Sequence, residues 1–219
     1  MIKIVLLCSS LFIFLWGCTS HDTLTQASQS EIQEFCKGNP KRIAVIGATS
    51  QIKGTEWENH LIAHGISNIL SQALCDTGNF VLVESNSEVQ EKLQKMIDSH
   101  WTERKAYSEQ EADSIAKDLG CDAVAYAKVK SFSTNRARLV GPFAGATTTV
   151  VVEVEVNLKP CGKSTWQSVG VGKAKTNTVG MLFQVNQGKI YFDDTNVGKA
   201  TKQALLNAVD ALPIPTKNT

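Results

Sequence analysis

The spacing of hydrophobic and polar residues changes along the chain between two regular patterns. Residues 57–74 place apolar side chains every three or four positions, which is typical of an amphipathic helix. Residues 147–158 alternate valine with polar residues, which predicts a strand with one buried face. In chain order, the pattern predicts strands at 43–47, 80–84, 121–129, 147–158 and 166–174, and helices at 57–74, 87–100, 108–120 and 196–212. Residues 101–107 form a predicted polar connector.

The order of these elements indicates an α+β fold with α/β character. Strands alternate with helices in the first half, so we expect those strands to be parallel. A short turn at residues 159–163 joins the next two strands as an antiparallel hairpin. With 219 residues, of which 42% are hydrophobic and 20% are charged, the chain fits a single domain: a mixed sheet with helices packed against it.

The N-terminus has the pattern of a bacterial lipoprotein. One positive charge and an apolar stretch too short to cross a bilayer precede Leu15-Trp16-Gly17-Cys18, which resembles a lipobox. We therefore expect residues 1–17 to be a signal peptide, Cys18 the lipidated residue, 18–35 a flexible tether, and 36–215 the folded domain. By the family's sorting rule, Thr19 favours the outer membrane, with the domain facing the periplasm. The alternative is that Cys18 ends an ordinary signal peptide.

The remaining cysteines suit an oxidising compartment. Cys36, Cys75, Cys121 and Cys161 are an even number, and the predicted topology places all four at one edge of the sheet. Two disulfides could form there, in any of three connectivities. Free buried thiols are the alternative.

No residue set indicates catalysis, a cofactor or a metal. A net charge of +1 gives no basic stripe for nucleic acid. His60 and His64 lie four residues apart, a spacing that can hold a metal, but the Glu of a zinc-protease motif is missing. Asp193 and Asp194 fit the start of the last helix better than acid–base catalysis. We therefore expect a non-enzymatic protein without cofactor.

Four segments together resemble the CsgG-like outer-membrane lipoproteins: residues 41–46, 80–85, 112–124 and 198–201. The likeness covers about residues 40–212, and the order and spacing of the segments carry it. That family shares its core fold with the LpoB-type activators of peptidoglycan synthases. The resemblance implies a periplasmic domain that binds other proteins, often copies of itself, and it does not imply catalysis.

Channel members of this family insert two β-hairpins per subunit, so export is an alternative function. Residues 132–147 contain Arg136 and Arg138 and make a poor membrane-spanning hairpin, and in residues 179–192 the return arm is too short. Soluble hairpins that pack on the sheet or on a partner are the other possibility. The expected role is an interaction or assembly module of an envelope secretion machine or cell-wall synthase, with a homo-oligomer as one outcome.

Exposed aromatic and basic residues are the candidates for contacting partners, since such residues dominate interface energetics. Each could equally belong to the core. The candidates are Trp57, Trp101, Arg136, Arg138, Phe143 and Phe183.

Overall fold

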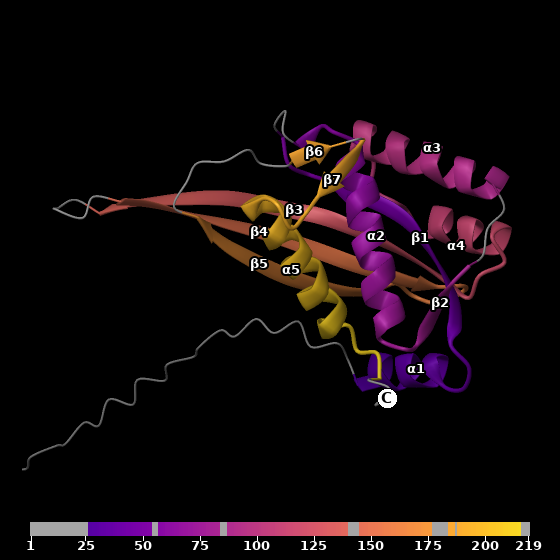
Figure 1. The fold of residues 1–219 in the computed structure, drawn as a ribbon. Helices are drawn as coiled ribbons and strands as arrows, with labels where there is room; N and C mark the ends of the chain where they lie inside the picture. Colours follow the sequence, from indigo (N-terminus) through magenta and orange to yellow (C-terminus); the bar gives the residue numbers. More distant parts are fainter. Residues whose placement is uncertain are drawn as a thin grey trace, which may run out of the picture.

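The computed structural model describes residues 26–53, 57–83, 87–139, 145–176, 184–186 and 188–215. Within them, helices lie on both faces of a five-stranded sheet (Figure 1). The helices are α1 (Gln26–Cys36), α2 (Leu61–Asp76), α3 (Ser87–Glu103), α4 (Glu109–Asp118) and α5 (Asn196–Ala211). The strands are β1 (Lys41–Ser50), β2 (Phe80–Leu82), β3 (Ala123–Leu139), β4 (Gly145–Pro160), β5 (Trp166–Thr176), β6 (Gln184–Asn186) and β7 (Lys189–Tyr191).

The sheet order is β2-β1-β3-β4-β5, and it confirms the predicted mixed topology. β1 is parallel to both β2 and β3, so Ile43 lies between Leu82 and Ala123. From β3 onward the neighbours are antiparallel, and Ala123 pairs with Pro160. The fold is therefore α+β, with parallel strands at one side of the sheet and an antiparallel meander at the other.

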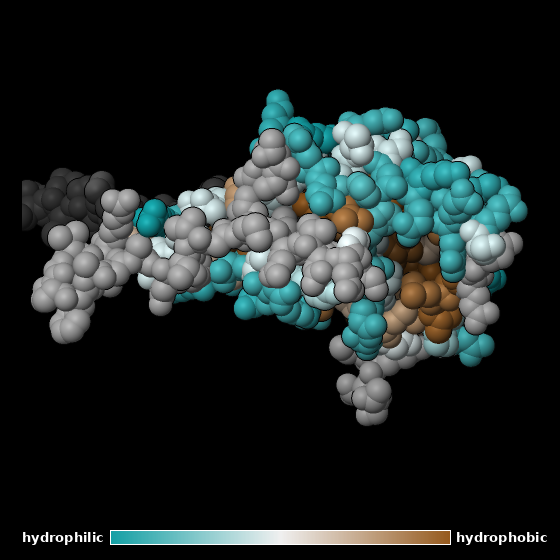
Figure 2. Space-filling model, turned by 45° about the horizontal axis from the view of Figure 1, so that its top comes forward, coloured by the Kyte–Doolittle hydropathy of each residue, from teal (hydrophilic) through white to brown (hydrophobic). Residues whose placement is uncertain are grey.

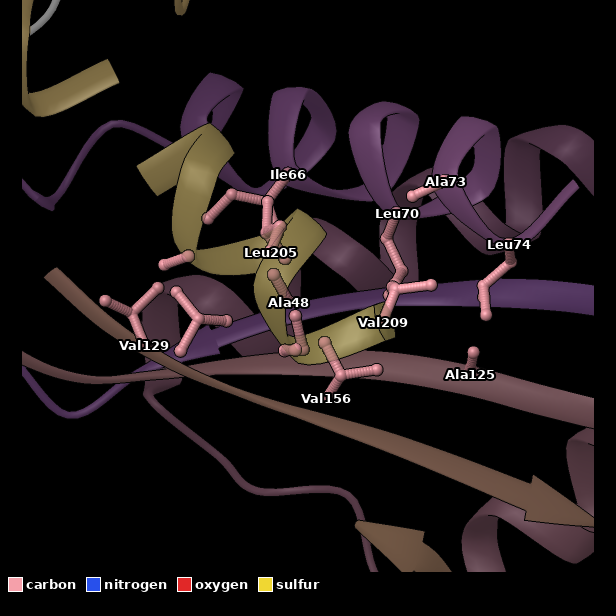
Figure 3. Packing of buried hydrophobic residues seen from close by; sticks show 14 of the residues in the cluster. Ala48, Ile66, Leu70, Ala73, Leu74, Ala125, Val129, Val156, Leu205 and Val209 are labelled. Carbon is pink, nitrogen blue, oxygen red and sulfur yellow. The ribbon is translucent and has the colours of Figure 1, made fainter. Parts of the chain in front are cut away.

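The larger core lies between the sheet and the helices α2 and α5. Ile66 and Leu70 of α2, together with Leu205 of α5, point at the sheet, where they meet small residues such as Ala125 (Figure 3). The helical spacing of these apolar positions gives each helix one buried stripe, as the sequence predicted. This packing fixes α5 against β4 and β5.

The helices α3 and α4 cover the opposite face of β1 and β3. Ala112 and Ala116 of α4 pack with Val124 and Tyr126 of β3. The predicted helix start at Ser108 is confirmed, because its hydroxyl accepts a hydrogen bond from the backbone N–H of Glu111 at 3.2 Å.

Two predicted boundaries near the helices differ from the structure. Helix α1 occupies part of the segment predicted as a tether, and the buried Ile32 anchors it in the core, so the folded part begins before Cys36. Helix α3 continues to Glu103, three residues into the predicted polar connector, and Trp101 in this last turn points inward and is only 2% exposed. None of the described helices combines the length and apolar character of a membrane span.

The antiparallel strands are longer than predicted. β3 was expected to end at Val129, but its ladder with β4 continues to the pair of Leu139 with Gly145. The residues beyond Val129 are mostly polar on both faces, so no apolar alternation marks them as a strand. The second predicted hairpin, in residues 179–192, is described only as the short strands β6 and β7, and β7 contacts α2.

Candidate interaction surface

Three strands extend past the rest of the sheet. The last pair of β1 with β3 is Ser50 with Val129, after which β3, β4 and β5 continue without β1. We call this extension the blade and define it as residues 132–139, 145–152 and 172–176. The blade contains Arg136, Arg138, Lys173 and Lys175 and no Asp or Glu. It projects away from the end of the molecule that carries α1 (Figure 1).

A groove of about 640 Å³ lies where β5 meets α5, at the base of the blade. Lysines from both elements line it: Lys173 and Lys175 from β5, and Lys199 and Lys202 from α5. Two acids, Asp193 and Asp210, also line the groove. Lys202 Nζ donates to both carboxylate oxygens of Asp193, at 2.8 and 3.0 Å, so the other three lysines outnumber the one remaining acid.

Small residues let α5 lie against β5 at backbone distance. A Cβ at Gly172 would be 1.8 Å from the carbonyl oxygen of Ala200, and one at Gly170 would be 2.0 Å from that of Ala204. No side chain can occupy either position without moving the helix. The glycines thereby allow the helix to pack directly on the strand.

Two amide side chains of α5 cover part of the outer edge of β5. The backbone N–H of Lys173 donates to Oε1 of Gln203 at 2.9 Å, and Nδ2 of Asn207 donates to the carbonyl oxygen of Val171 at 2.8 Å. Free edge strands invite pairing with another chain, and side chains that satisfy their backbone groups prevent it. This edge is therefore guarded, although Val169 and Val171 remain exposed on the face turned away from α5.

The other edge of the sheet exposes apolar side chains. Val81 and Leu82 of β2 are 45% and 47% exposed. The face shown in Figure 2 carries a hydrophobic area at its right-hand end, the end at which Figure 1 places β2. Burial raises the pKa of the neighbouring Cys75 thiol, and a hydrogen bond with the backbone of Leu82 opposes that rise. This edge is a second candidate contact surface.

A buried histidine links α3, α4 and β1. Nδ1 of His100 lies 3.0 Å from the carbonyl oxygen of Lys105, and Nε2 lies 3.0 Å from Oε1 of Glu111. The ring stacks on Tyr107 at 3.9 Å, and the Tyr107 hydroxyl donates to the carbonyl oxygen of Ile46. Both ring nitrogens thus have acceptors, and the cluster is used for packing.

The pKa values in this cluster follow from its burial. Burial is the main cause that raises the pKa of Tyr107 far above its ordinary value. For Glu111, burial alone would raise the pKa, but the facing His100 and Lys105 outweigh it and lower the pKa. The carboxylate is therefore held ionised as a partner of these two residues.

A fully buried lysine ties α4 to the turn between β4 and β5. Nζ of Lys159 donates to Oδ1 of Asp113 at 2.8 Å and also to the carbonyl oxygens of Pro160 and Lys163. The same Asp113 oxygen accepts the backbone N–H of Gly162 at 3.1 Å. The hydrogen bond from Lys159 lowers the pKa of Asp113.

The residues predicted to contact partners differ in their location in the structure. Trp57 and Trp101 are each 2% exposed and belong to the core, so the alternative interpretation holds for both, and they are not surface contacts. Arg136 is exposed on the blade, and Arg138 lies two residues further along β3. Cys18, Phe143 and Phe183 lie outside the described residues.

The histidine pair also has a structural explanation. The rings of His60 and His64 lie 6.1 Å apart, and Nε2 of His64 pairs with Oδ1 of Asp98 at 2.7 Å, which joins α2 to α3. Within the described ranges, no group of three or more His, Cys, Asp or Glu side chains is placed to hold a metal ion.

The four cysteines are all free thiols in the described part of the chain, so neither of the two disulfides considered from the sequence is formed there. Cys36 is buried in the core on the α2 and α5 side, whereas Cys121 is buried on the α4 side. These two cysteines thus belong to different clusters of buried side chains. Cys161 is exposed, and its backbone N–H donates to the carbonyl oxygen of Asp122.

The sequence analysis missed the lysine groove and the apolar edge at β2. A signal for the groove exists in the spacing: Lys173 and Lys175 are two apart on a strand, and Lys199 and Lys202 are three apart on a helix, so each pair shares one face. Nothing in the sequence indicates that this strand and this helix lie side by side.

No protein-family model matches the chain, and no curated protein sequence matches it. Solved structures that resemble it include lipoprotein GNA1162 from Neisseria meningitidis, with 16% identity, a TM-score of 0.44, and coverage of 64% of this chain and 88% of that one. The C-terminal domain of LpoB from Salmonella enterica has 15% identity, a TM-score of 0.36, and coverage of 68% and 93%. A PelC dodecamer from Paraburkholderia phytofirmans has 12% identity, a TM-score of 0.37, and coverage of 77% and 89%.

These similarities are too weak to assign a family or an activity. Bacterial lipoproteins are among the structures that the chain resembles, but no match supports membership of the CsgG-like family itself.

Proposed function

We propose that this chain is a non-enzymatic lipoprotein of the bacterial outer membrane that faces the periplasm and acts as an interaction module of an envelope assembly or secretion machine. The observation that carries the proposal is Leu15-Trp16-Gly17-Cys18, followed closely by a domain that folds from α1 onward. A lipid anchor beside a compact domain suits a protein that works by holding partners near a membrane.

The surface of the domain supports a binding role. The blade and the groove beside α5 present exposed basic side chains, and β2 presents exposed apolar ones. By contrast, His64, His100, Glu111 and Lys159 are engaged in contacts that hold helices and turns together. These four acid–base groups thus have structural partners, and the exposed surfaces are the candidates for contact.

The anchor is tested by replacing Cys18 with Ser in bacteria fed a palmitate analogue. We expect the wild-type protein to incorporate the label and to fractionate with the outer membrane, and Cys18→Ser to do neither. Cys161→Ser is the matched control, because it removes an exposed thiol without touching the anchor. Label incorporation that survives Cys18→Ser, or a cytosolic wild-type protein, would overturn the proposal.

Self-association is a second proposal, favoured by the exposure of Val81 and Leu82 at the edge of the sheet. We expect the detergent-solubilised mature protein to form oligomers that Leu82→Glu dissociates, as measured by light scattering after size exclusion. Leu206→Glu, at an exposed leucine of α5, is the control. A protein that stays monomeric across the concentration range would exclude this contact. The export-pore and synthase-activator alternatives remain predictions.

A further inference from the structure

We propose that the groove between β5 and α5 binds an extended, acidic segment of a partner protein. This inference rests on the proposed function and specifies the chemistry of its partner. The groove has a volume of about 640 Å³ and is lined by lysines from two elements.

The charge of the groove continues along the blade. Lys173 and Lys175 alternate with Gly172 and Ala174, which face α5, so these two lysines border the groove from the rim of the edge strand β5. Arg136 lies on β3, on the opposite face of the sheet from Lys173 and Lys175. All three side chains are exposed. Because the blade contains no acidic residue, this region has a positive potential although the whole chain carries a net charge of only +1. In the groove itself, Asp193 is paired with Lys202, and Asp210 is the other acid among the lining residues.

The way a partner can bind is limited by the side chains that cover the outer edge of β5. Gln203 and Asn207 already satisfy the outward backbone groups of Lys173 and Val171. A partner therefore cannot add a strand to β5 along this stretch without displacing both amides. Recognition must come from side chains, chiefly the ammonium groups of Lys173, Lys175 and Lys199. Among the described residues, none of these three forms an ion pair, whereas Lys202 pairs with Asp193.

The shape of the site favours a chain over a lipid surface. A flat anionic membrane could touch only one face of the blade at a time, whereas the basic groups lie on both faces and around a concave groove. An extended peptide can lie in the groove and place successive carboxylates near the lysines of β5 and α5. Leu206, 40% exposed at the same groove, offers an apolar contact to such a chain.

The test measures binding of fluorescein-labelled decaglutamate to the full mature lipoprotein in detergent by fluorescence anisotropy. We expect Lys173→Gln, Lys175→Gln and Lys199→Gln, combined in one variant, to weaken binding about tenfold, since three exposed ion pairs are lost. Changing the same three residues to Arg should restore it. The matched control combines Lys92→Gln, Lys95→Gln and Lys117→Gln, which remove equal charge from α3 and α4 and should change affinity less than threefold.

Each other outcome would overturn the proposal. Equal weakening in the control would show that net charge alone attracts the probe. If the protein bound decaglutamine with the same affinity as decaglutamate, backbone strand addition rather than charge would explain the binding. If phosphatidylglycerol vesicles lost binding to the triple lysine variant while decaglutamate did not, the site would be assigned to lipid headgroups. A protein that carries lipid at Cys18 and shows none of the expected binding would refute the groove assignment alone and leave the proposed anchor intact.

Discussion

The buried ion pair of Lys159 and Asp113 gives a sharp stability prediction. The Lys159 side chain is 3% exposed and that of Asp113 is 28% exposed. Replacing Asp113 with Ala leaves a buried ammonium whose remaining acceptors are the carbonyl oxygens of Pro160 and Lys163. Removing one partner of a buried pair costs about 3–5 kcal/mol, and the two carbonyls and the partial exposure of Asp113 favour the lower end, about 3 kcal/mol.

For a chain of this size, about 3 kcal/mol corresponds to a fall in melting temperature of roughly 6–12 °C. Circular dichroism during heating at neutral pH measures it. The reverse change, Lys159→Met, should cost much less, because it removes the buried charge and leaves a carboxylate that water can reach. Asp118→Ala, at an exposed acid of the same helix, is the control and should melt near the wild type.

The asymmetry between the two partners is the decisive result. If Asp113→Ala melted within about 2 °C of the wild type, or if Lys159→Met were the more damaging change, the pair would not hold α4 to the turn as the structure indicates.

Two further predictions concern packing and pH. Gly172→Ala should destabilise the fold by about 2–3 kcal/mol in urea unfolding, because the added Cβ meets the backbone of Ala200. The control is Gly38→Ala, whose Cβ would meet nothing, although the positive φ of Gly38 gives this variant a cost of its own. Equal losses of stability in the two variants would refute the clash. The second prediction follows from two lowered carboxyl pKa values. Hydrogen bonds from Thr165 lower the pKa of Glu109, and a hydrogen bond from Lys159 lowers that of Asp113. A pKa lower in the folded than in the unfolded chain adds stability that is complete above about pH 4.5 and is lost as the pH falls further. Unfolding free energies measured from pH 7 to pH 3 should decline only below that point and less in Asp113→Asn; a decline already at pH 6 would contradict this.

The sequence predicted the parts of the fold that side-chain periodicity determines. The alternation of Val150, Val152 and Val154 marked β4, and Ser108 marked the start of α4. The parallel arrangement followed from the order of strands and helices. These features depend on residues close in sequence or on one buried face.

The blade and the buried lysine could not be predicted in this way. The β3 arm of the blade, residues 132–139, is mostly polar on both faces, so no apolar alternation marks it as a strand although its backbone pairs with β4. Lys159 stands in a sequence typical of a turn, and its burial depends on Asp113, 46 residues away. Trp101 stands beside polar residues and is buried only because α3 lies across β1.

The candidate site shows the same division between local and long-range information. The lysine pairs of β5 and α5 are each visible as a spacing, but the groove also needs α5 to pack on β5, and Gly170 and Gly172 permit that close approach. The guard formed by Gln203 and Asn207 depends on the same close approach.

The start of α1 at Gln26 limits how far the domain can travel from the bilayer. With the lipid at Cys18, as proposed, only residues 19–25 separate the acyl chains from the helix, and they span at most about 25 Å when fully stretched. β3, with 17 residues, adds about 55 Å if straight. The far end of the molecule can thus lie at most on the order of 80 Å from the lipidated Cys18, and any binding partner must come within that distance.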